Sequence, residues 1–597
     1  MHPAQYEIPE VTPLRLRSIL QDFHSNRAPG PDQLEVELFK SMPKVVLQIV
    51  ANYINHWIAT QEQDGEELLA RVASIYKKGD SKLPENYRPI SLLNTIYKLK
   101  ARILKDAIEA GIEQELQTTQ YAFRKACSTL QPIHCIRRLM DKAERAGEPL
   151  GIVLLDWEKA FDKITRSSLL HTLRRYQVHE QLIAMVASLY HETQFYVKYN
   201  SSSSEKHTQH TGIRQGCPLS PYLFIIVMSA MWADINKDLG YDKTEHYIKC
   251  VEKEDPTFNE LLYADDTLIF HPRTAQLTKT LAIVITESAK YGMSLNRGKC
   301  EFLGLNCGRS PLWPDGRAVK SVHRAKYLGT ILTSNNDKDP EMSARIKDAM
   351  ASWRRMEIVW KLKRCSVKTR LQYWNMVIRA KLMYGLYLIA LTQAQSRRLN
   401  AFQNKGLRQI LGLKTTYINP RNSNEFIFEE ANRIMLTETK QANRERNHIR
   451  EYRGLKPTFM PPPRPIRPLT EEHRDQHRKY IGHLLREPRG LPTRDSTFDS
   501  NGNFNLRPKN RVGGMQKKWT ELGFELYWQF AQEPYAKRTG RHDILGTTYA
   551  KDDIEHRRII HDMAIWKMNK GCVRQSQRRG KAKPPASVRG KARGLPF

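Results

Sequence analysis

A pair of adjacent aspartates inside an apolar segment constrains this chain more than any other feature. Asp265 and Asp266 lie between the short apolar runs 261–263 and 267–270. Two such runs around a two-residue break predict a β-hairpin with the carboxylates at its tip. Aspartate is also common in turns because its side chain bonds to nearby backbone, so the pair alone leaves a plain turn open.

A second acidic position makes a metal site the better interpretation. The apolar run 151–155 leads directly into Asp156, about a hundred residues before the pair. Strands that end in aspartate place carboxylates on rigid elements, and two metal ions held in this way roughly 3.5–4 Å apart catalyse in-line phosphoryl transfer. We therefore predict a metal site formed by Asp156, Asp265 and Asp266, with the backbone carbonyl of Trp157 as a further ligand.

Composition favours a polyanionic partner and an intracellular location. The chain has 597 residues, a net charge of +33 and a pI near 9.8. Such a charge attracts nucleic acid, although a solvated basic surface or a membrane-facing patch remains possible. The eight cysteines show no CxxC spacing, the N-terminus lacks a secretory apolar core, and no apolar stretch is long enough to span a bilayer. We expect an intracellular protein that is not secreted and does not enter a membrane.

Hydrophobic patterning predicts an α+β fold followed by helices. Residues 1–150 are expected to be mixed helix and loop. Residues 151–335 alternate strands with helices, which indicates a sheet with helices on one face. Strands are expected at 151–155, 195–199, 261–263, 267–270 and 327–332, and helices at 221–235 and 276–291. From residue 341 amphipathic helices with a basic face take over.

The C-terminal third begins with a run of prolines. Residues 456–468 contain six prolines, which excludes a helix or a central strand and predicts a linker. Residues 469–570 contain helical pieces with a weak apolar pattern. Residues 573–597 hold eight Lys and Arg and no acid, so we expect this tail to be disordered on its own.

A glycine-flanked polar loop, residues 211–221, lies between the two acidic segments. Such a loop lets backbone approach a base pair closely before a helix begins at Pro221, although a simple turn with a helix start explains it equally well. In this order, the segments resemble the palm motifs of reverse transcriptases of non-LTR (LINE-like) retrotransposons. Supporting matches are Arg27–Asp32, Tyr76–Asp80, Asn86–Leu92, Gln120–Arg124, Leu295-Asn296 with Lys299 and Cys300, and Tyr327–Gly329.

This resemblance implies a right-hand polymerase with an antiparallel palm sheet. We expect fingers at 1–150, palm at 151–335, a helical thumb at 336–455, the linker at 456–468, a basic, mostly helical module at 469–572 and the tail at 573–597. The implied activity is RNA-directed extension of a primer 3′-hydroxyl with dNTPs, using two Mg²⁺ ions, with Mn²⁺ able to substitute. The implied partners are an RNA template, a DNA primer and the RNA–DNA hybrid, in a nuclear or cytoplasmic ribonucleoprotein.

The resemblance also assigns roles to single residues. Arg88, and less directly Lys77, would contact the triphosphate, although each alone is an ordinary surface cation. Gln215 and Gly216 would line the nucleotide pocket, and Lys299 would protonate pyrophosphate. The turn formed by Tyr327, Leu328 and Gly329 would grip the primer backbone, although in isolation a plain turn at a strand edge explains it nearly as well.

Phe161, five residues after Asp156, decides the expected sugar. An aromatic side chain there excludes a ribose 2′-hydroxyl by its bulk, which selects deoxynucleotides and disfavours an RNA polymerase. RNA polymerases of this kind carry an aspartate at that spacing. In this chain the aspartate is Asp162, which would lie on the opposite side if the segment is extended.

Two expectations remain open on sequence grounds. The chain begins just before the first motif and shows no cysteine–histidine knuckle, so no endonuclease is evident. The rival hypothesis is a catalytically inactive RNA- or DNA-binding scaffold derived from such an enzyme. Against it, carboxylates that repel one another without metal would be lost first in a decaying copy, and Asp156, Asp265 and Asp266 are all present.

Overall fold

The computed structural model describes residues 10–199, 202–240, 258–362 and 364–484, together with 487, 491–497, 519, 520 and 522. These residues divide into an N-terminal unit, up to Met350, and a C-terminal unit, from Ala351 on. The expected tail at 573–597 and most of the module at 469–572 lie outside the described residues. No helix among the described residues is long and apolar enough to cross a membrane.

The first part of the N-terminal unit combines helices with a strand hairpin that the sequence pattern did not predict. β1 (Ala70–Tyr76) and β2 (Tyr87–Leu92) pair antiparallel, and β4 (Gln194–Tyr199) joins β1 in parallel. The small strands β5 (Ser202–Ser203) and β6 (His207–Thr208) pair with β4. The accompanying helices are α1 (Pro13–Asp22), α2 (Val36–Ser41), α3 (Lys44–Thr60), α4 (Gly65–Leu68), the 3₁₀ turn η1 (Pro84–Asn86) and α5 (Thr95–Ile112).

A four-stranded antiparallel sheet forms the second part, in the order β7-β8-β3-β9. Its strands are β3 (Leu150–Leu155), β7 (Glu260–Tyr263), β8 (Asp266–His271) and β9 (Glu301–Leu305). The expected strands at 151–155, 261–263 and 267–270 are therefore confirmed. β3 is buried along almost its whole length, which requires cover on both faces.

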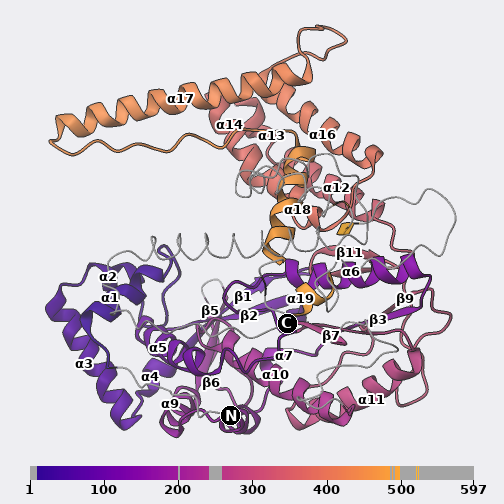
Figure 1. Cartoon of the computed structure of the whole chain (residues 1–597). Coiled ribbons are helices and arrows are strands. Elements are labelled where there is room, and N and C mark those ends of the chain that lie inside the picture. The colour runs from indigo at the N-terminus through magenta and orange to yellow at the C-terminus, as the bar shows by residue number, and fades with distance from the viewer. Residues whose placement is uncertain are drawn as a thin grey trace, which may run out of the picture. The chain divides into compact units, whose positions relative to one another are not determined.

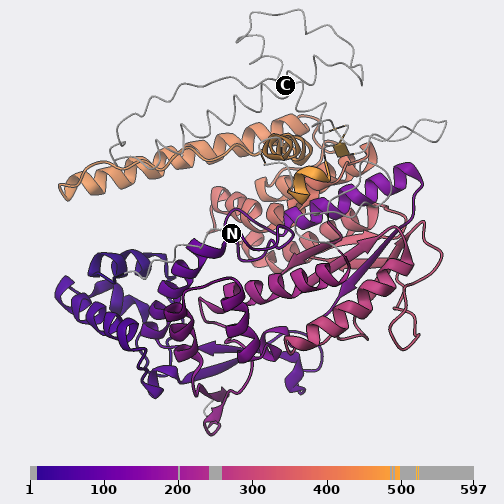
Figure 2. The ribbon, with the colours of Figure 1, turned by 60° about the horizontal axis from the view of Figure 1, so that its bottom comes forward.

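Helices cover both faces of this sheet, so the expectation of helices on one face was wrong. α6 (Leu130–Ala146) packs against β7 and β9, while α11 (Thr274–Lys290) packs against β8 and β3. Figures 1 and 2 show these two helices on opposite sides of the strands. The remaining helices of this part are α7 (Ala160–Lys163), α8 (Arg166–Arg175), α9 (Glu180–Tyr190) and α10 (Ser220–Asp238).

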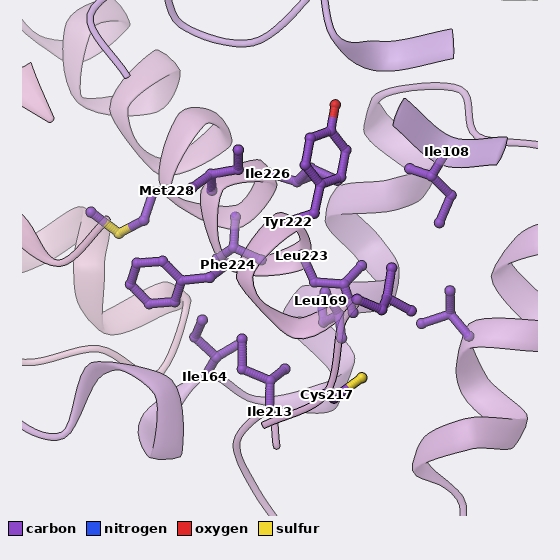
Figure 3. Packing of buried hydrophobic residues seen from close by; sticks show 14 of the residues in the cluster. Ile108, Ile164, Leu169, Ile213, Cys217, Tyr222, Leu223, Phe224, Ile226 and Met228 are labelled. Atoms are coloured by element: carbon purple, nitrogen blue, oxygen red, sulfur yellow. The ribbon is translucent and has the colours of Figure 1, made fainter. Parts of the chain in front are cut away.

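Helix α10 lies at the centre of the hydrophobic core. It begins with Pro221 in its first turn, where proline loses no helical hydrogen bond. Residues 222–232 of α10 are all buried, as expected for a helix that is apolar around its whole circumference. Figure 3 shows its side chains packed against Ile108, Leu169 and Ile213 from three other segments.

The expected strand at 327–332 is in fact a tight hairpin. β10 (Arg324–Tyr327) and β11 (Thr330–Thr333) pair antiparallel across Leu328 and Gly329. Both turn residues have positive φ, +46° and +82°, the combination that suits a two-residue hairpin turn. The expected turn at these residues is therefore present, and it divides the strand that the apolar pattern predicted. The pattern runs through the turn because Leu328, which is strained at positive φ, occupies one of the two turn positions.

The described residues of the C-terminal unit contain helices and no strand. Helix α16 (Gln393–Leu411) packs against α18 (Leu469–Leu484), and α14 (Val367–Tyr373) packs against α17 (Asn424–Tyr452). The ring of Trp353 stacks on Trp360 and meets Trp374 edge-on. α12 (Asp339–Arg355) crosses the division between the units. The other helices are α13 (Glu357–Lys361), α14 (Val367–Tyr373), the π-helical η2 (Trp374–Arg379), α15 (Ala380–Met383), η3 (Leu386–Leu388), α16 (Gln393–Leu411), α17 (Asn424–Tyr452), α18 (Leu469–Leu484) and α19 (Pro492–Asp495).

His473 makes the C-terminal unit sensitive to acid. Its Nε2 lies 3.0 Å from the carbonyl oxygen of Leu386 and 3.1 Å from that of Ile389, and burial lowers its pKa to about 4. Because the folded pKa is below the ordinary value of about 6.5, this residue contributes stability above pH 6.5 that is lost as the pH falls toward 4.

We therefore expect the urea midpoint of the C-terminal unit, followed by tryptophan fluorescence, to fall between pH 7 and pH 5 in the wild type. His473→Gln removes the titrating group and should reduce this fall. His448→Gln, at an exposed position on α17, is the control. An equal fall in all three proteins would contradict the assignment to His473.

Candidate active site at the ends of β3 and the β7–β8 hairpin

Strand pairing brings the three predicted carboxylates to one end of the sheet. β3 and β8 pair with Leu155 opposite Thr267, so the next position along the same register places Asp156 opposite Asp266. β7 and β8 form the expected hairpin, with Tyr263 opposite Asp266 and Ala264 and Asp265 in the turn. The expected meeting of the two acidic segments is present in the structure.

Gln120 holds the hairpin turn in place and was not recognised as a site residue from sequence. Ala264 adopts φ +56°, a strained value for a residue other than glycine. Its N–H donates to Gln120 Oε1 at 3.1 Å, and the same oxygen accepts from Ala122 N at 2.9 Å. Gln120 is fully buried. In the sequence, Gln120 is marked only as the first residue of the matching segment Gln120–Arg124, which does not show that its side chain supports a turn.

The site raises the pKa values of the two adjacent carboxyl groups, Asp265 and Asp266. Burial, then the negative charges of Asp265 and Asp156, raises the pKa of Asp266 to about 6. Burial, with the charge of Asp156, also raises the pKa of Asp265. The ionised forms of Asp265 and Asp266 are therefore unfavourable without a positive charge nearby.

Positive charges come from the hairpin of β1 and β2. Lys77 and Arg88 both act to lower the pKa of Asp265, and Lys77 also acts on Asp266, so both cations lie within electrostatic reach of the carboxylates. Ile75 pairs with Arg88, and Lys77 N donates to Asn86 O at 2.8 Å. This register places Lys77 and Arg88 diagonally on one face of the hairpin.

Lys299 lies beside Asp156 at the same end of the sheet. Its Nζ is 3.8 Å from Asp156 Oδ2, and both side chains are well exposed. The segment before it runs along the end of β3, because Asn296 N donates to Asp156 O at 2.8 Å and Trp157 bridges to Leu295. The indole Nε1 of Trp157 donates to Thr267 Oγ1 at 3.0 Å, which ties the residue after Asp156 to β8.

Residues that can hold a divalent cation are therefore close together but not arranged as a finished site. Among the described residues, no group of three or more His, Cys, Asp or Glu side chains is placed to hold a metal ion. The donors themselves suit a hard cation, because Mg²⁺ prefers carboxylate and carbonyl oxygens. The structural observation that fits such an ion is the raised pKa of Asp265 and Asp266, both of which lie close to the charge of Asp156.

Phe161 packs against the core on one side of this site. Its ring stacks on Phe224 with centroids 4.3 Å apart. Residues 160–163 form helix α7 instead of an extended segment, so Asp162 is not on the opposite side as expected. Asp162 Oδ1 instead accepts from Gln215 Nε2 at 3.4 Å, and Ile213 N donates to the carbonyl oxygen of Phe161 at 2.8 Å.

The loop at 211–217 is anchored to β2 at its glycine. Ser91 N donates to Gln215 O at 2.7 Å. Gly216 has φ +120°, and a Cβ there would lie 2.4 Å from Ser91 O, so only glycine fits. The buried guanidinium of Arg214, missed as a site residue, bonds to the carbonyl oxygen of Leu68. A buried arginine next to the predicted pocket residues is a second positioning group.

The β10–β11 hairpin, which carries the predicted primer-grip residues, is fixed through its backbone. Arg345 donates to Gly329 O at 2.7 Å, and Ile331 N donates to Glu341 at 2.6 Å. The fully buried Arg137 of α6 donates to Ile331 O at 2.6 Å and Thr330 Oγ1 at 3.0 Å. Burial, followed by the charge of Asp266, raises the pKa of Tyr327, so this hairpin also lies within electrostatic reach of the carboxylates.

Comparison with known proteins agrees with this geometry. Residues 75–332 match the family described as "Reverse transcriptase (RNA-dependent DNA polymerase)". This range contains Lys77, Arg88, the three carboxylates and the primer-grip turn. The residues from 75 to 332 therefore form a reverse-transcriptase domain.

The relatives place this domain among those of retrotransposons. The "Transposon TX1 uncharacterized 149 kDa protein" of Xenopus laevis is 24% identical over 64% of this chain and 29% of its own length. The "Probable RNA-directed DNA polymerase from transposon BS" of Drosophila melanogaster is 24% identical over 68% and 46%. The type-1 element R2 polyprotein of Popillia japonica is 27% identical over 46% and 36%.

These relatives confirm the resemblance to the reverse transcriptases of non-LTR retrotransposons. The chain spans less than half the length of each of the three relatives.

Removing one carboxylate should stabilise the metal-free protein. The folded pKa of Asp266 is above its ordinary value, so ionisation as the pH rises from about 4 to above 6 lowers the free energy of unfolding. We expect Asp266→Asn to raise the melting temperature in EDTA at pH 7.5, and to do so much less at pH 4.5. Differential scanning fluorimetry measures this, with the exposed Glu10→Gln as control. A lower melting temperature for Asp266→Asn at pH 7.5 would contradict the repulsion.

Proposed function

We propose that the chain is an RNA-directed DNA polymerase that extends a primer 3′-hydroxyl with dNTPs. The observation that carries the proposal is the meeting of Asp156, Asp265 and Asp266 at one sheet end, within electrostatic reach of Lys77, Arg88 and Tyr327. In-line phosphoryl transfer needs an anionic metal site, cations for the triphosphate and a support for the primer end. The fold brings three carboxylates, two cations and the β10–β11 hairpin together from segments far apart in sequence, which supports this proposal.

Asp156, Asp265, Asp266 and the carbonyl of Trp157 would hold two Mg²⁺ ions, with Mn²⁺ able to substitute. When bound, the ions supply charge neutralisation at the attacking and leaving oxygens and lower the pKa of the 3′-hydroxyl. The chain contributes a rigid framework for these donors, because strand pairing fixes the backbone positions that carry the carboxylates.

Other side chains would bind and orient the substrate. Arg88 and Lys77 would neutralise the triphosphate, and the exposed Lys299 would supply a proton on the pyrophosphate side. Phe161, backed by Phe224, would exclude the ribose 2′-hydroxyl, and Gln215 with Gly216 would line the base pair. Tyr327, Leu328 and Gly329 would support the primer end.

The proposed partners are an RNA template, a DNA primer, their hybrid and dNTPs, in a nuclear or cytoplasmic ribonucleoprotein. The net charge of +33 supports binding to these polyanions.

Extension of a DNA primer on an RNA template, with dNTPs and Mg²⁺, tests the proposal. We expect extension by the full chain and none above background by Asp265→Ala, because the remaining carboxylates cannot hold the ions in place. Asp238→Ala, at an exposed position near the end of α10, should retain activity. Gel analysis of labelled primer gives the result. Tight binding of the hybrid without extension by the wild type would instead support the inactive scaffold.

The sugar preference tests Phe161 separately. Phe161→Ala should improve the use of ribonucleotides relative to deoxynucleotides by roughly 10- to 100-fold, because the group that fills the space at the sugar is removed. Phe161→Tyr keeps the ring and should keep the discrimination. Single-turnover incorporation of dNTP and rNTP measures the ratio. An unchanged ratio in Phe161→Ala would remove this residue from sugar selection.

A further inference from the structure

The C-terminal unit carries an arm that consists of helix α17 and the extended segment that follows it. Residues 454–468 form neither helix nor strand and run back alongside α17 (Figure 1). Asn443 exchanges two hydrogen bonds with the backbone of Met460, at 3.1 and 2.9 Å. Asn432 does the same with Ile466, at 3.0 and 2.7 Å, and Asn447 accepts from Thr458 N at 2.9 Å.

These asparagines explain why the segment is held against the helix. A helix uses its own backbone groups internally, so only side chains can pair with an extended strand. Positions 432, 443 and 447 are separated by eleven and four residues, which places them near one face of α17. Each amide offers one acceptor and two donors. The prolines in the segment favour extended backbone, which reduces the entropy lost on docking.

Charge is divided sharply along helix α17. Residues 424–439 of α17 carry four glutamates and a single cation, Arg433. The arm tip, defined here as residues 440–460, has only Glu445 and Glu451 against six cations. The six are Lys440, Arg444, Arg446, Arg450, Arg453 and Lys456.

The helix dipole does not account for the basic tip. A dipole favours cations only within the last turn of a helix. Arg444 and Arg446 precede the last turn, and Arg453 and Lys456 lie beyond the end of α17 at Tyr452. The positive charge is therefore a property of the tip surface.

Two aromatic side chains stand exposed among these cations. Tyr452 is 92% exposed and Phe459 is 75% exposed. Exposed aromatic rings between basic residues are typical of surfaces that bind single strands, where bases stack on rings and phosphates meet cations. An apolar protein partner would leave the six cations without a role.

We propose that the arm tip binds single-stranded RNA by stacking bases on Tyr452 and Phe459 and pairing phosphates with the surrounding cations. This site is separate from the carboxylate cluster and does not depend on the proposed polymerase activity. Asn432, Asn443 and Asn447 act as positioning residues, because they hold the segment that carries Phe459 against the helix that carries Tyr452.

Binding of a fluorescein-labelled 20-nucleotide oligouridylate to the full chain tests the stacking. The double variant Tyr452→Ala with Phe459→Ala should bind about tenfold more weakly in fluorescence anisotropy. Tyr417→Ala is the matched control, because Tyr417 is 97% exposed and precedes α17, whose 29 residues span roughly 43 Å. Equal loss in the control, or no loss in the double variant, would overturn the proposal.

The salt dependence tests the cations. Replacing Arg444, Arg453 and Lys456 with Gln should lower the slope of log K against log salt by about 2. Replacing the exposed Lys44, Lys279 and Arg309 of the N-terminal unit with Gln removes the same charge and should change the slope much less. Equal changes in both triple variants would show that net charge, and not the arm, controls binding.

Photocrosslinking of an oligouridylate containing 4-thiouridine locates the contact by mass spectrometry. Crosslinks within residues 440–460 support the proposal, and their absence there overturns it. A 20-base-pair DNA duplex and an acidic peptide are measured alongside. A larger effect of the arm variants on either of these probes would assign the tip to that partner instead.

The outcomes remain distinct from those of the proposed polymerase. Arm variants should still extend a primer–template with a three-nucleotide overhang, whereas Asp265→Ala should still bind the oligouridylate. Failure of one experiment therefore leaves the other intact.

Discussion

The antiparallel pairing of β3 with β8 is the constraint on which the candidate site depends. It carries Asp156 to the same sheet end as a hairpin more than a hundred residues later in the chain. Burial, together with the charges of the neighbouring carboxylates, then raises the pKa values of Asp265 and Asp266 and makes their ionised forms unfavourable. The surrounding fold has to supply the stability that their ionisation removes. The buried helix α10 and the helices on both sheet faces provide that support through apolar packing.

Local patterns predicted the centre of this site well. The strands before Asp156 and around Asp265 are short apolar runs bounded by polar residues, and such runs are determined by nearest neighbours in sequence. Lys77, Arg88 and Tyr327 could be placed near the carboxylates only through the family resemblance. Their segments meet through long-range packing, which periodicity does not encode.

The supporting residues that the sequence did not reveal act through contacts between distant segments. Gln120 and Arg137 support turns that lie about 140 and 190 residues away, so neither has a local signature. The strand expected at 327–332 fails for a local reason, because Leu328 occupies a backbone conformation usually given to glycine. Residues 456–468 have the composition of a linker and form no helix or strand, and asparagines on α17 bind their backbone. Composition does not show which partner a proline-rich segment has.

The link between Ser91 and the loop at Gln215 has a consequence for how such an enzyme could evolve. Strand β2 also carries Arg88, so one short strand joins the proposed triphosphate contact to the loop proposed to line the nucleotide pocket. A shift of this strand would displace Gly216 as well, because the two backbones touch without room for a Cβ. Adaptation to a different nucleotide pool could therefore arise from substitutions beneath β2 that never contact the nucleotide.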